Sequence, residues 1–406
     1  MRSVEEHLKK ILELVEPLPP YEQALLDALG LPICEDIFAP LDLPGFDNSA
    51  MDGYACHRAD VVDASRENAV VLPVVGESAA GQTKAYALPR GQVVKIMTGA
   101  PMPAGADAVV PIEWTDGGRA RVSVMQAPER GQHVRAQGED VHKGDRLLNE
   151  GTLVGPREAM ILAATGYARV RARPRPRVVV LSTGSELREP GSPLGFDSIY
   201  DANSFAIAAA ARQADAIAYR VGIVSDDPHE LMATLSDQLV RADLVVTSGG
   251  VSKGDYDVVK EVLSRFGTVE FTEVAMQPGK PQGFGTIGDD ATPIFTLPGN
   301  PVSSYISFEV FVLPAIRRMM GRLPYRRPMV QAVCMAGLSS PRGRKQFVRG
   351  HFEVTPRGAQ VTPVGGHGSH LIGSLSQSNS LIVVPEASSG VDEGATVDVL
   401  ALDRNF

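Results

Sequence analysis

The feature that most constrains the fold is an alternation of apolar runs and helical stretches between residues 177 and 321. Its first member, Val178-Val179-Val180-Leu181, is a continuous apolar run, which is typical of a strand buried on both faces of a sheet. Further strands are predicted at 219–224, 244–246, 269–274 and 294–297, and helices at 203–212, 228–240, 256–266 and 302–320. The alternation predicts a doubly wound, mostly parallel α/β sheet with helices on both faces.

The segments before this region combine helices with a β-rich stretch. Apolar residues recur at helical spacing from Val4 to Val15, and Ser3 with Glu6 resembles a capping box. A second helix is predicted between Pro20 and Gly30, and a third at 157–165. Between them, short β-prone runs alternate with Gly and Pro at 70–75, 93–97 and 108–112. We therefore expect a mostly-β domain inserted into an elongated domain that contains helices.

The changes in pattern predict four domains. The helical period disappears after about residue 326, and β-prone runs predict a small C-terminal β-barrel at 330–334, 346–354, 359–364 and 380–384. The predicted boundaries are 1–43 with 141–172 for the elongated domain, 44–140 for the inserted β domain, 173–325 for the α/β domain and 326–406 for the C-terminal β domain.

Composition and charge limit the functional classes. Apolar residues make up 44% of the 406 residues and charged residues 21%, the balance of a soluble globular protein. No apolar run reaches the roughly 18–20 residues that cross a bilayer, and no apolar signal segment follows Met1. The net charge of −9 argues against a nucleic-acid surface, which needs clustered Lys and Arg. Because the three cysteines form no disulfide framework, we expect a reducing compartment and therefore a cytoplasmic protein. From the apolar runs and the net charge, we expect that it binds neither membrane nor nucleic acid.

The loops that leave the predicted strands are rich in small residues. In an open α/β sheet, ligands bind outside the carboxyl ends of the strands. Five loops should meet there, at 182–186, 225–228, 247–255, 277–281 and 297–301. Successive backbone N–H groups in such turns form anion sites, and the Thr-Ser-Gly-Gly-Val-Ser stretch at 247–252 is a candidate for holding a phosphate. A single glycine-rich turn can be an ordinary connector, so the indication comes from all five loops together.

Acidic residues lie on three of these loops, namely Glu186, Asp226 and Asp255. Carboxylates beside an anion site repel the ligand unless a cation lies between them, and Mg²⁺ binds through one or two carboxylates while it bridges to phosphate. The pattern indicates a metal-assisted reaction on a phosphate-bearing substrate, with Mg²⁺ or another divalent cation. The alternative is that the acids cap helices, which fits Asp227 before Pro228.

Two cationic residues could hold an oxyanion. Arg349 could bind it bidentately and Lys280 as a point charge, although most such residues are solvated surface groups. The sequence contains no GxGxxG, Walker A or GxSxG motif, which removes the commonest nucleotide-binding and hydrolase interpretations.

With these residues in view, the chain resembles the MoeA family of molybdopterin molybdenumtransferases, the family of the gephyrin E domain. The matching motifs follow one another through nearly the whole chain: Phe46-Asp47-Asn48-Ser49-Ala50-Met51-Asp52-Gly53-Tyr54, Ile96-Met97-Thr98-Gly99-Ala100, Gly138-Glu139-Asp140, Ser182-Thr183-Gly184-Ser185-Glu186, Thr247-Ser248-Gly249-Gly250-Val251-Ser252, Pro278-Gly279-Lys280-Pro281 and Leu297-Pro298-Gly299-Asn300-Pro301. The first and last of these are the most specific.

The resemblance implies a reaction and an assembly. Such proteins take adenylylated molybdopterin and molybdate, cleave the adenylate with a divalent cation, release AMP and leave molybdenum on the dithiolene sulfurs. The family forms homodimers of elongated subunits, with each active site between the α/β domain of one subunit and the inserted β domain of the other. Contacts with the molybdopterin adenylyltransferase and with molybdoenzyme maturation proteins are also expected.

The resemblance also implies roles for residues at matching positions. The catalytic residues would be Asp52 and Thr98, reaching the site from the partner subunit, with Asp140, Glu186, Asp226 and Asp255 around the metal and the pterin phosphate. Of these, Glu186, Asp226 and Asp255 would be the metal ligands. Substrate-binding residues would be Thr183, Gly184, Ser248, Gly249, Gly250 and Ser252, with Lys280, Arg349 and Ser369 for molybdate and Pro298 and Pro301 beneath the pterin. Gln277 stands where some relatives have a second lysine, which leaves the placement of molybdate open.

Two other functions stay open. The α/β domain resembles the MogA-type domain that adenylylates molybdopterin, so the chain could activate the pterin rather than insert the metal. A scaffold role of the gephyrin type is the second alternative. The added β domains and the segment 47–54 favour insertion.

Overall fold

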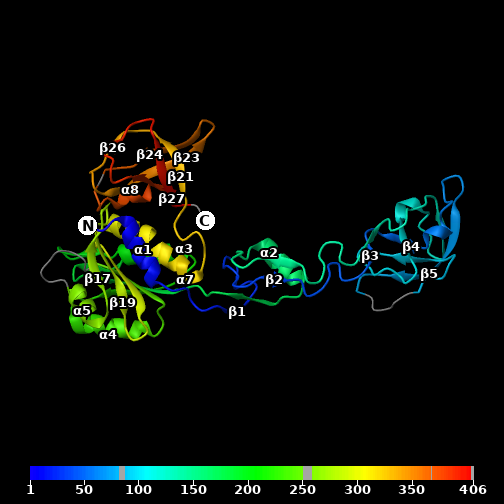
Figure 1. Cartoon of the computed structure of the whole chain (residues 1–406), viewed down its shortest axis with the longest axis horizontal. Helices are drawn as coiled ribbons and strands as arrows, with labels where there is room; N and C mark the ends of the chain where they lie inside the picture. Colours follow the sequence, from blue (N-terminus) through cyan, green and yellow to red (C-terminus); the bar gives the residue numbers. More distant parts are fainter. Residues whose placement is uncertain (82–86, 250–257, 367, 404–406) are drawn as a thin grey trace. The chain divides into compact units, whose positions relative to one another are not determined.

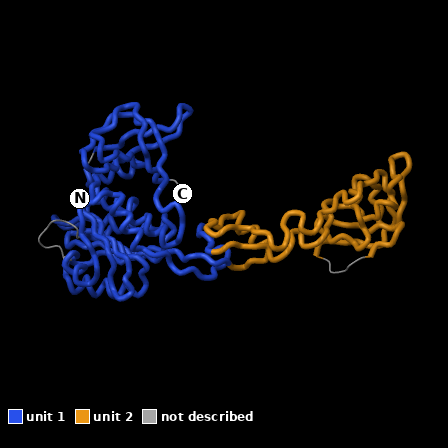
Figure 2. Tube along the Cα trace, in the orientation of Figure 1, with its two compact units in different colours: residues 1–34, 170–406 blue, residues 35–169 orange. Residues whose placement is uncertain are grey.

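The computed structural model describes residues 1–81, 87–249, 258–366 and 368–403. The chain forms two compact units (Figure 2), which we treat separately. Unit 1 comprises Met1–Cys34 and Val170–Phe406, and unit 2 comprises Glu35–Arg169. The finer division into four domains stays a prediction.

A six-stranded sheet forms the centre of unit 1 (Figure 1). Its order across the sheet is β15 (Ile217–Val224), β12 (Arg177–Thr183), β16 (Leu244–Ser248), β20 (Thr292–Leu297), β19 (Pro281–Ile287) and β17 (Glu270–Glu273). The first four strands are parallel neighbours, as the apolar runs predict. Strand β19, which the sequence did not reveal, is antiparallel to both its neighbours. Its residues interleave Gly with Phe, Thr and Ile, so no apolar run marks it.

Helices cover both faces of this sheet (Figure 1). Val178 and Val180 of β12 pack into one apolar core, while Val179 and Leu181 pack into another on the opposite face. The first core lies under α1 (Val4–Leu14), α3 (Asn203–Gln213), α6 (Pro301–Ser307), the π-helical turn η3 (Phe308–Val312) and α7 (Leu313–Met320). The second lies under α4 (Pro228–Leu239) and α5 (Val258–Phe266). Burial on both faces confirms the predicted doubly wound architecture.

The C-terminal part of unit 1 is a small closed barrel. Its strands follow the order β23 (Lys345–Thr355), β24 (Gly358–Pro363), β21 (Met329–Cys334), β27 (Thr396–Ala401) and β25 (Ser380–Val384). Pairing of β25 with β23 closes the ring, and β18 (Met276–Gln277) joins β23 from the α/β part. Unit 1 also contains shorter elements, namely β13 (Leu187–Arg188), β14 (Ile199–Tyr200), β22 (Leu338–Ser339), α8 (Ile372–Ser376) and β26 (Gly390–Val391).

The helix predicted between Pro20 and Gly30 is wrong. That segment holds β1 (Tyr21–Ala24), which pairs with β11 (Arg169–Ala172), followed by turns. Side chains also connect this segment to the strand and loop around β11, because Gln23 donates to the Ala172 carbonyl oxygen at 3.0 Å and Arg175 donates to the carbonyl oxygens of Asp27 and Leu29. Tertiary contacts therefore override a weak helical preference. The capping box of α1 is confirmed, since the Ser3 hydroxyl accepts from Glu6 N–H and the Glu6 carboxylate accepts from Ser3 N–H.

Unit 2 is mostly β, as predicted. A five-stranded sheet has the order β7 (Ala108–Pro111), β4 (Gly53–Cys56), β6 (Val93–Ile96), β5 (Val70–Ser78) and β8 (Arg121–Val124). Two further pairs join β2 (Ile37–Phe38) to β10 (Arg146–Leu148) and β3 (Asn48–Ser49) to β9 (Val134–Arg135). The remaining elements are η1 (Arg58–Asp60), η2 (Ile112–Trp114) and the predicted helix, α2 (Pro156–Ala164).

Within the described ranges, no helix has the length and apolar character needed to cross a bilayer.

Gly53 of β4 lies where the five-stranded sheet leaves no room for a side chain. A Cβ there would lie 2.0 Å from the Val110 carbonyl oxygen of the neighbouring strand β7. We predict that Gly53→Ala lowers the free energy of unfolding of unit 2 by about 2–3 kcal/mol, as overpacking against a rigid backbone does. Urea unfolding followed by the fluorescence of Trp114, the single tryptophan of the chain, measures this change. Gly45→Ala in the same unit is the control, because its Cβ would meet only Asp42 O at 3.8 Å. Equal stability of both variants would contradict the prediction.

Candidate functional site

The carboxyl ends of the four parallel strands meet at one edge of the unit 1 sheet, which we call the rim. Thr183 lies opposite Val224 in the register of β12 and β15, and Ser248 of β16 lies opposite both Ser182 and Leu297. The loops that follow Thr183, Val224, Ser248 and Leu297 therefore start side by side. This arrangement is the one expected for ligand binding in an open α/β sheet.

Two of the predicted metal ligands lie on neighbouring rim loops. Ser185 donates from its backbone N–H and its hydroxyl to Asp226 Oδ2, at 2.9 and 2.8 Å. The Glu186 carboxylate lies over Gly184, where a Cβ would be 2.6 Å from Glu186 Oε2. Both carboxylates are exposed, and Asp227 caps α4 as predicted by accepting from His229 and Glu230. The rim thus presents two acids that are not used as helix caps.

The remaining predicted rim residues divide into described and undescribed positions. Gly250, Ser252 and Asp255 lie outside the described residues. Among the described residues, no group of three or more His, Cys, Asp and Glu side chains is arranged to hold a metal ion. A metal site at the rim therefore stays a prediction.

Gly249 joins the loops after β12, β16 and β20. Its φ is +98°, a Cβ there would lie 2.9 Å from Thr183 O, and its N–H donates to Leu297 O at 3.1 Å. Only glycine adopts this backbone readily and leaves room for Thr183. The predicted substrate-binding residues Thr183, Gly184, Ser248 and Gly249 are thus in one place, beside the buried Pro298.

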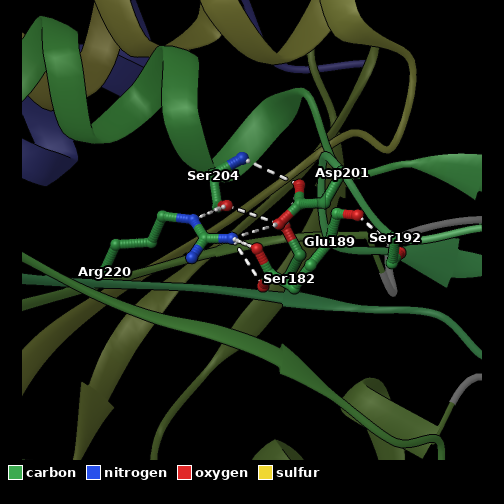
Figure 3. Close-up of polar contacts among 6 residues, drawn as sticks. All are labelled: Ser182, Glu189, Ser192, Asp201, Ser204 and Arg220. Atoms are coloured by element: carbon green, nitrogen blue, oxygen red, sulfur yellow. Dashed lines mark hydrogen bonds and ion pairs between the residues drawn. The ribbon is translucent and has the colours of Figure 1, made fainter.

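A buried carboxylate near the rim was missed by the sequence reasoning. Figure 3 shows Asp201 between Ser182 and Ser204, with Arg220 beside it. Asp201 is 1% exposed and accepts from the Ser182 hydroxyl at 3.0 Å, the Ser204 N–H at 3.1 Å and the Ser204 hydroxyl. Arg220 lies 3.8 Å from Asp201 Oδ2 and also pairs with Glu189. The available signal was the group of capping residues Asp201, Asn203 and Ser204 at the start of an Ala-rich helix.

A pocket in unit 1 contains Arg349, the residue predicted to hold an oxyanion. The pocket encloses about 270 Å³, part of it open to solvent, and is lined by Gln277, Pro278, Val302, Gln346, Phe347, Val348, Arg349, Gly366 and Gly368. Arg349 is 4% exposed and donates to the carbonyl oxygens of Leu371 at 2.9 Å, Gly368 at 3.3 Å and Gly366. Burial lowers the pKa of its guanidinium. A buried guanidinium beside a cavity favours an anionic ligand.

The other two residues predicted for molybdate do not line this pocket in the described structure. The Lys280 ammonium lies 3.0 Å from Glu273 Oε2 in an ion pair. Ser369 contacts the start of α6, because its carbonyl oxygen accepts from Val302 N–H at 3.1 Å. Pro301 is the first residue of α6, so Ser369 lies next to it.

Asp52 and Thr98 lie together in unit 2. Thr98 donates to Asp52 Oδ1 from its backbone N–H at 2.7 Å and from its hydroxyl at 2.8 Å. These hydrogen bonds lower the pKa of the exposed Asp52 carboxyl, because they stabilise its charged form. Asp140 is also in unit 2 and exposed, and its backbone N–H donates to Leu43 O at 3.0 Å.

Backbone hydrogen bonds explain why the two motifs of unit 2 meet. Ser49 N–H donates to Ala100 O at 3.0 Å, and Gly99 N–H donates to Ser49 O at 2.8 Å. The segment that contains Asp52 is thereby held against the segment that contains Thr98.

The small loops of the rim, with their two carboxylates, and the pocket with a buried arginine are candidate sites for a phosphate-bearing or other anionic ligand. Comparisons identify the class. Residues 2–166 match the MoeA N-terminal region (domain I and II), residues 179–318 a "Probable molybdopterin binding domain", and residues 331–402 the MoeA C-terminal region (domain IV). The chain belongs to the MoeA family.

Relatives match along their full length. Molybdopterin molybdenumtransferase 2 of Mycobacterium tuberculosis is 44% identical over 405 residues, covering 98% of this chain and 99% of that protein. Molybdopterin molybdenumtransferase 1 of the same organism is 40% identical and covers 100% of both chains. A molybdopterin biosynthesis MoeA protein from Pyrococcus horikoshii has a similar structure, with a TM-score of 0.83, 30% identity and 99% coverage of both chains.

The hydrogen bonds from Thr98 should determine the pKa of the Asp52 carboxyl. Thr98→Val removes the hydroxyl donor, so the pKa of Asp52 should rise toward that of an ordinary aspartate. The hydrogen bonds stabilise the folded unit above the unfolded-state pKa of Asp52, and this contribution is lost as the pH falls through the depressed folded-state pKa. Carboxyl ¹³C NMR titration measures the shift. Thr152→Val, the same side-chain change elsewhere in unit 2, should leave the Asp52 titration unchanged, and an unshifted Asp52 in Thr98→Val would refute the assignment.

Proposed function

We propose that this chain is a molybdopterin molybdenumtransferase that transfers molybdenum from molybdate to adenylylated molybdopterin and releases AMP. The observation that carries the proposal is the rim, where small anion-binding loops and the carboxylates of Glu186 and Asp226 lie together. A substrate with a pyrophosphate needs N–H donors for its oxygens, and carboxylates beside it need a cation between them. The matches to the MoeA N- and C-terminal regions support insertion over adenylylation.

Glu186 and Asp226 would hold a divalent cation, with Asp255 as a further ligand. Their exposed carboxylates are the hard oxygen donors that Mg²⁺ prefers, and Ser185 fixes Asp226 through one oxygen only. A bound cation would neutralise charge that develops on the phosphate when the adenylate is cleaved. The residues of this chain supply the rest, since Gly249 and the loops around it orient the phosphate.

Molybdate would enter the pocket that contains Arg349. The guanidinium is buried and donates to the carbonyl oxygens of Gly366, Gly368 and Leu371, which carry no formal charge, so it can supply positive charge to an anion in the pocket. Lys280 would contribute its ammonium after leaving Glu273, and Ser369 would supply polar atoms from the adjoining loop. Gln277 lines the same pocket and would contact molybdate through its neutral amide.

Asp52 would act on the adenylate from a second copy of the chain. The two hydrogen bonds from Thr98 to Oδ1 orient the Asp52 carboxylate, which would accept a proton from the water that attacks the AMP phosphorus. The attack breaks the phosphoanhydride bond and releases AMP. Because Asp52 and Glu186 belong to different units, a homodimer in which unit 2 of one copy serves unit 1 of the other would complete the site, with Asp140 beside it.

The proposal extends to the protein's surroundings. The chain would act in the cytoplasm, receive its substrate from the molybdopterin adenylyltransferase and deliver its product to molybdoenzyme maturation proteins. The net charge of −9 fits a protein that does not bind nucleic acid.

Reconstitution tests the function. Purified protein supplied with adenylylated molybdopterin, Mg²⁺ and molybdate should release AMP and yield cofactor that activates a molybdoenzyme apoprotein. Asp52→Asn should lower AMP release by about 10²–10⁴-fold, the range associated with loss of a general base.

Two controls make the assay specific. Asp63→Asn, a change of the same kind at an exposed residue of unit 2, should keep wild-type activity. Protein that forms adenylylated molybdopterin from ATP and molybdopterin, but releases no AMP from it, would instead be an adenylyltransferase and would refute insertion.

A further inference from the structure

Asn203 connects two rim loops through one side chain. It is the first residue of α3, and its Nδ2 donates to Ser248 Oγ at 2.8 Å and to Gly299 O at 2.6 Å. Ser248 ends β16, and Gly299 lies in the loop after β20. Because an amide nitrogen carries two hydrogens, these two bonds use its full donor capacity. The side chain therefore fixes the distance between the two loops.

Asp201 holds Asn203 in place. Its buried carboxylate binds Ser204 N–H in the first turn of α3 and the Ser182 hydroxyl at the end of β12 (Figure 3). Arg220 of β15 offsets the charge, and its guanidinium stacks 4.0 Å from the centre of the Phe205 ring. The start of α3 is thereby attached to β12 and β15, while Asn203 reaches the loops after β16 and β20.

We propose that Asn203, held by Asp201, is a positioning residue that sets the spacing of the anion-binding loops for the phosphate of the pterin substrate. The inference rests on the proposed function. The loops it joins contain the predicted substrate-binding residues Ser248, Gly249 and Pro298, and a neutral amide links them without placing a negative charge beside the phosphate. Asn203 itself need not touch the substrate.

The chemistry of the link explains why an amide is needed. An aspartate at this position keeps the size of the side chain, but it cannot donate to Gly299 O and would place its charge against that carbonyl. Ser248 could still turn its hydroxyl to donate. Asn203→Asp therefore removes one connection and adds a repulsion, while Asn203→Ala removes both connections.

The test compares loop order with substrate binding in the full-length protein. In Asn203→Asp, hydrogen–deuterium exchange at the Gly249 N–H, which is bonded to Leu297 O, should accelerate about tenfold or more. The KM for adenylylated molybdopterin should rise by a similar factor, while kcat and the KM for molybdate change less than about threefold. Gln213→Glu makes the same amide-to-carboxylate change at an exposed position of the same helix and should match the wild type.

Each other outcome overturns the proposal. Wild-type exchange and KM in both Asn203 variants would show that the link does not set the loop spacing. A lower Tm and lower kcat at unchanged KM would show a structural role only. If the wild type releases no AMP, the proposed function fails separately, and equilibrium binding of adenylylated molybdopterin, followed by pterin fluorescence, replaces KM. If the Asn203 variants then show unchanged binding and unchanged Gly249 exchange, the positioning role of Asn203 is rejected as well.

Discussion

The parallel pairing of β12 with β15 and β16, continued to β20, is the constraint on which the candidate site depends. These strands are buried on both faces, between one apolar core that contains Val178 and Val180 and another that contains Val179 and Leu181. Apolar burial of this kind stabilises the sheet, so the loops at its carboxyl edge need not contribute to the core. Glu186, Asp226 and Gly249 are on those loops. The rim is thus a consequence of strand direction.

The polar contacts at the rim have a different physical basis. Asp201 is a buried charge, and such a charge is tolerated only where hydrogen bonds and a cation compensate for lost hydration. Ser182, Ser204 and Arg220 provide that compensation, which ties α3 to two strands of the sheet. Unit 2 holds Asp52 at Thr98 without burying the carboxylate, because backbone bonds join Ser49 to the 99–100 segment and Asp52 itself is exposed. Each unit therefore organises its own part of the proposed chemistry.

Short sequence patterns correctly predicted several buried strands and helix starts. Continuous apolar runs and the Ser3–Glu6 capping box identified β12, β16 and α1, and the Asp227-Pro228 cap was also confirmed. Strands β1 and β19 were missed because long-range pairing, not composition, makes them strands. The burial of Arg349 depends on carbonyl oxygens 17 to 22 residues later, and the Lys280–Glu273 ion pair depends on the pairing of β17 with β19, so no local pattern revealed either of them. Asp52 and Glu186, which the boundaries predicted from the sequence place in different domains, lie in different units.

The central claim is that the Asp52 of one copy serves the Glu186 of another, and subunit complementation tests it most directly. Asp52→Ala and Glu186→Ala are each inactive if both residues are essential. Equal amounts mixed under conditions of subunit exchange should recover about one quarter of wild-type AMP release, since half the dimers are mixed and each has one intact site of two. Size-exclusion chromatography confirms that exchange has occurred between tagged and untagged chains. Mixed dimers with no more activity than either variant alone would contradict a site shared between subunits.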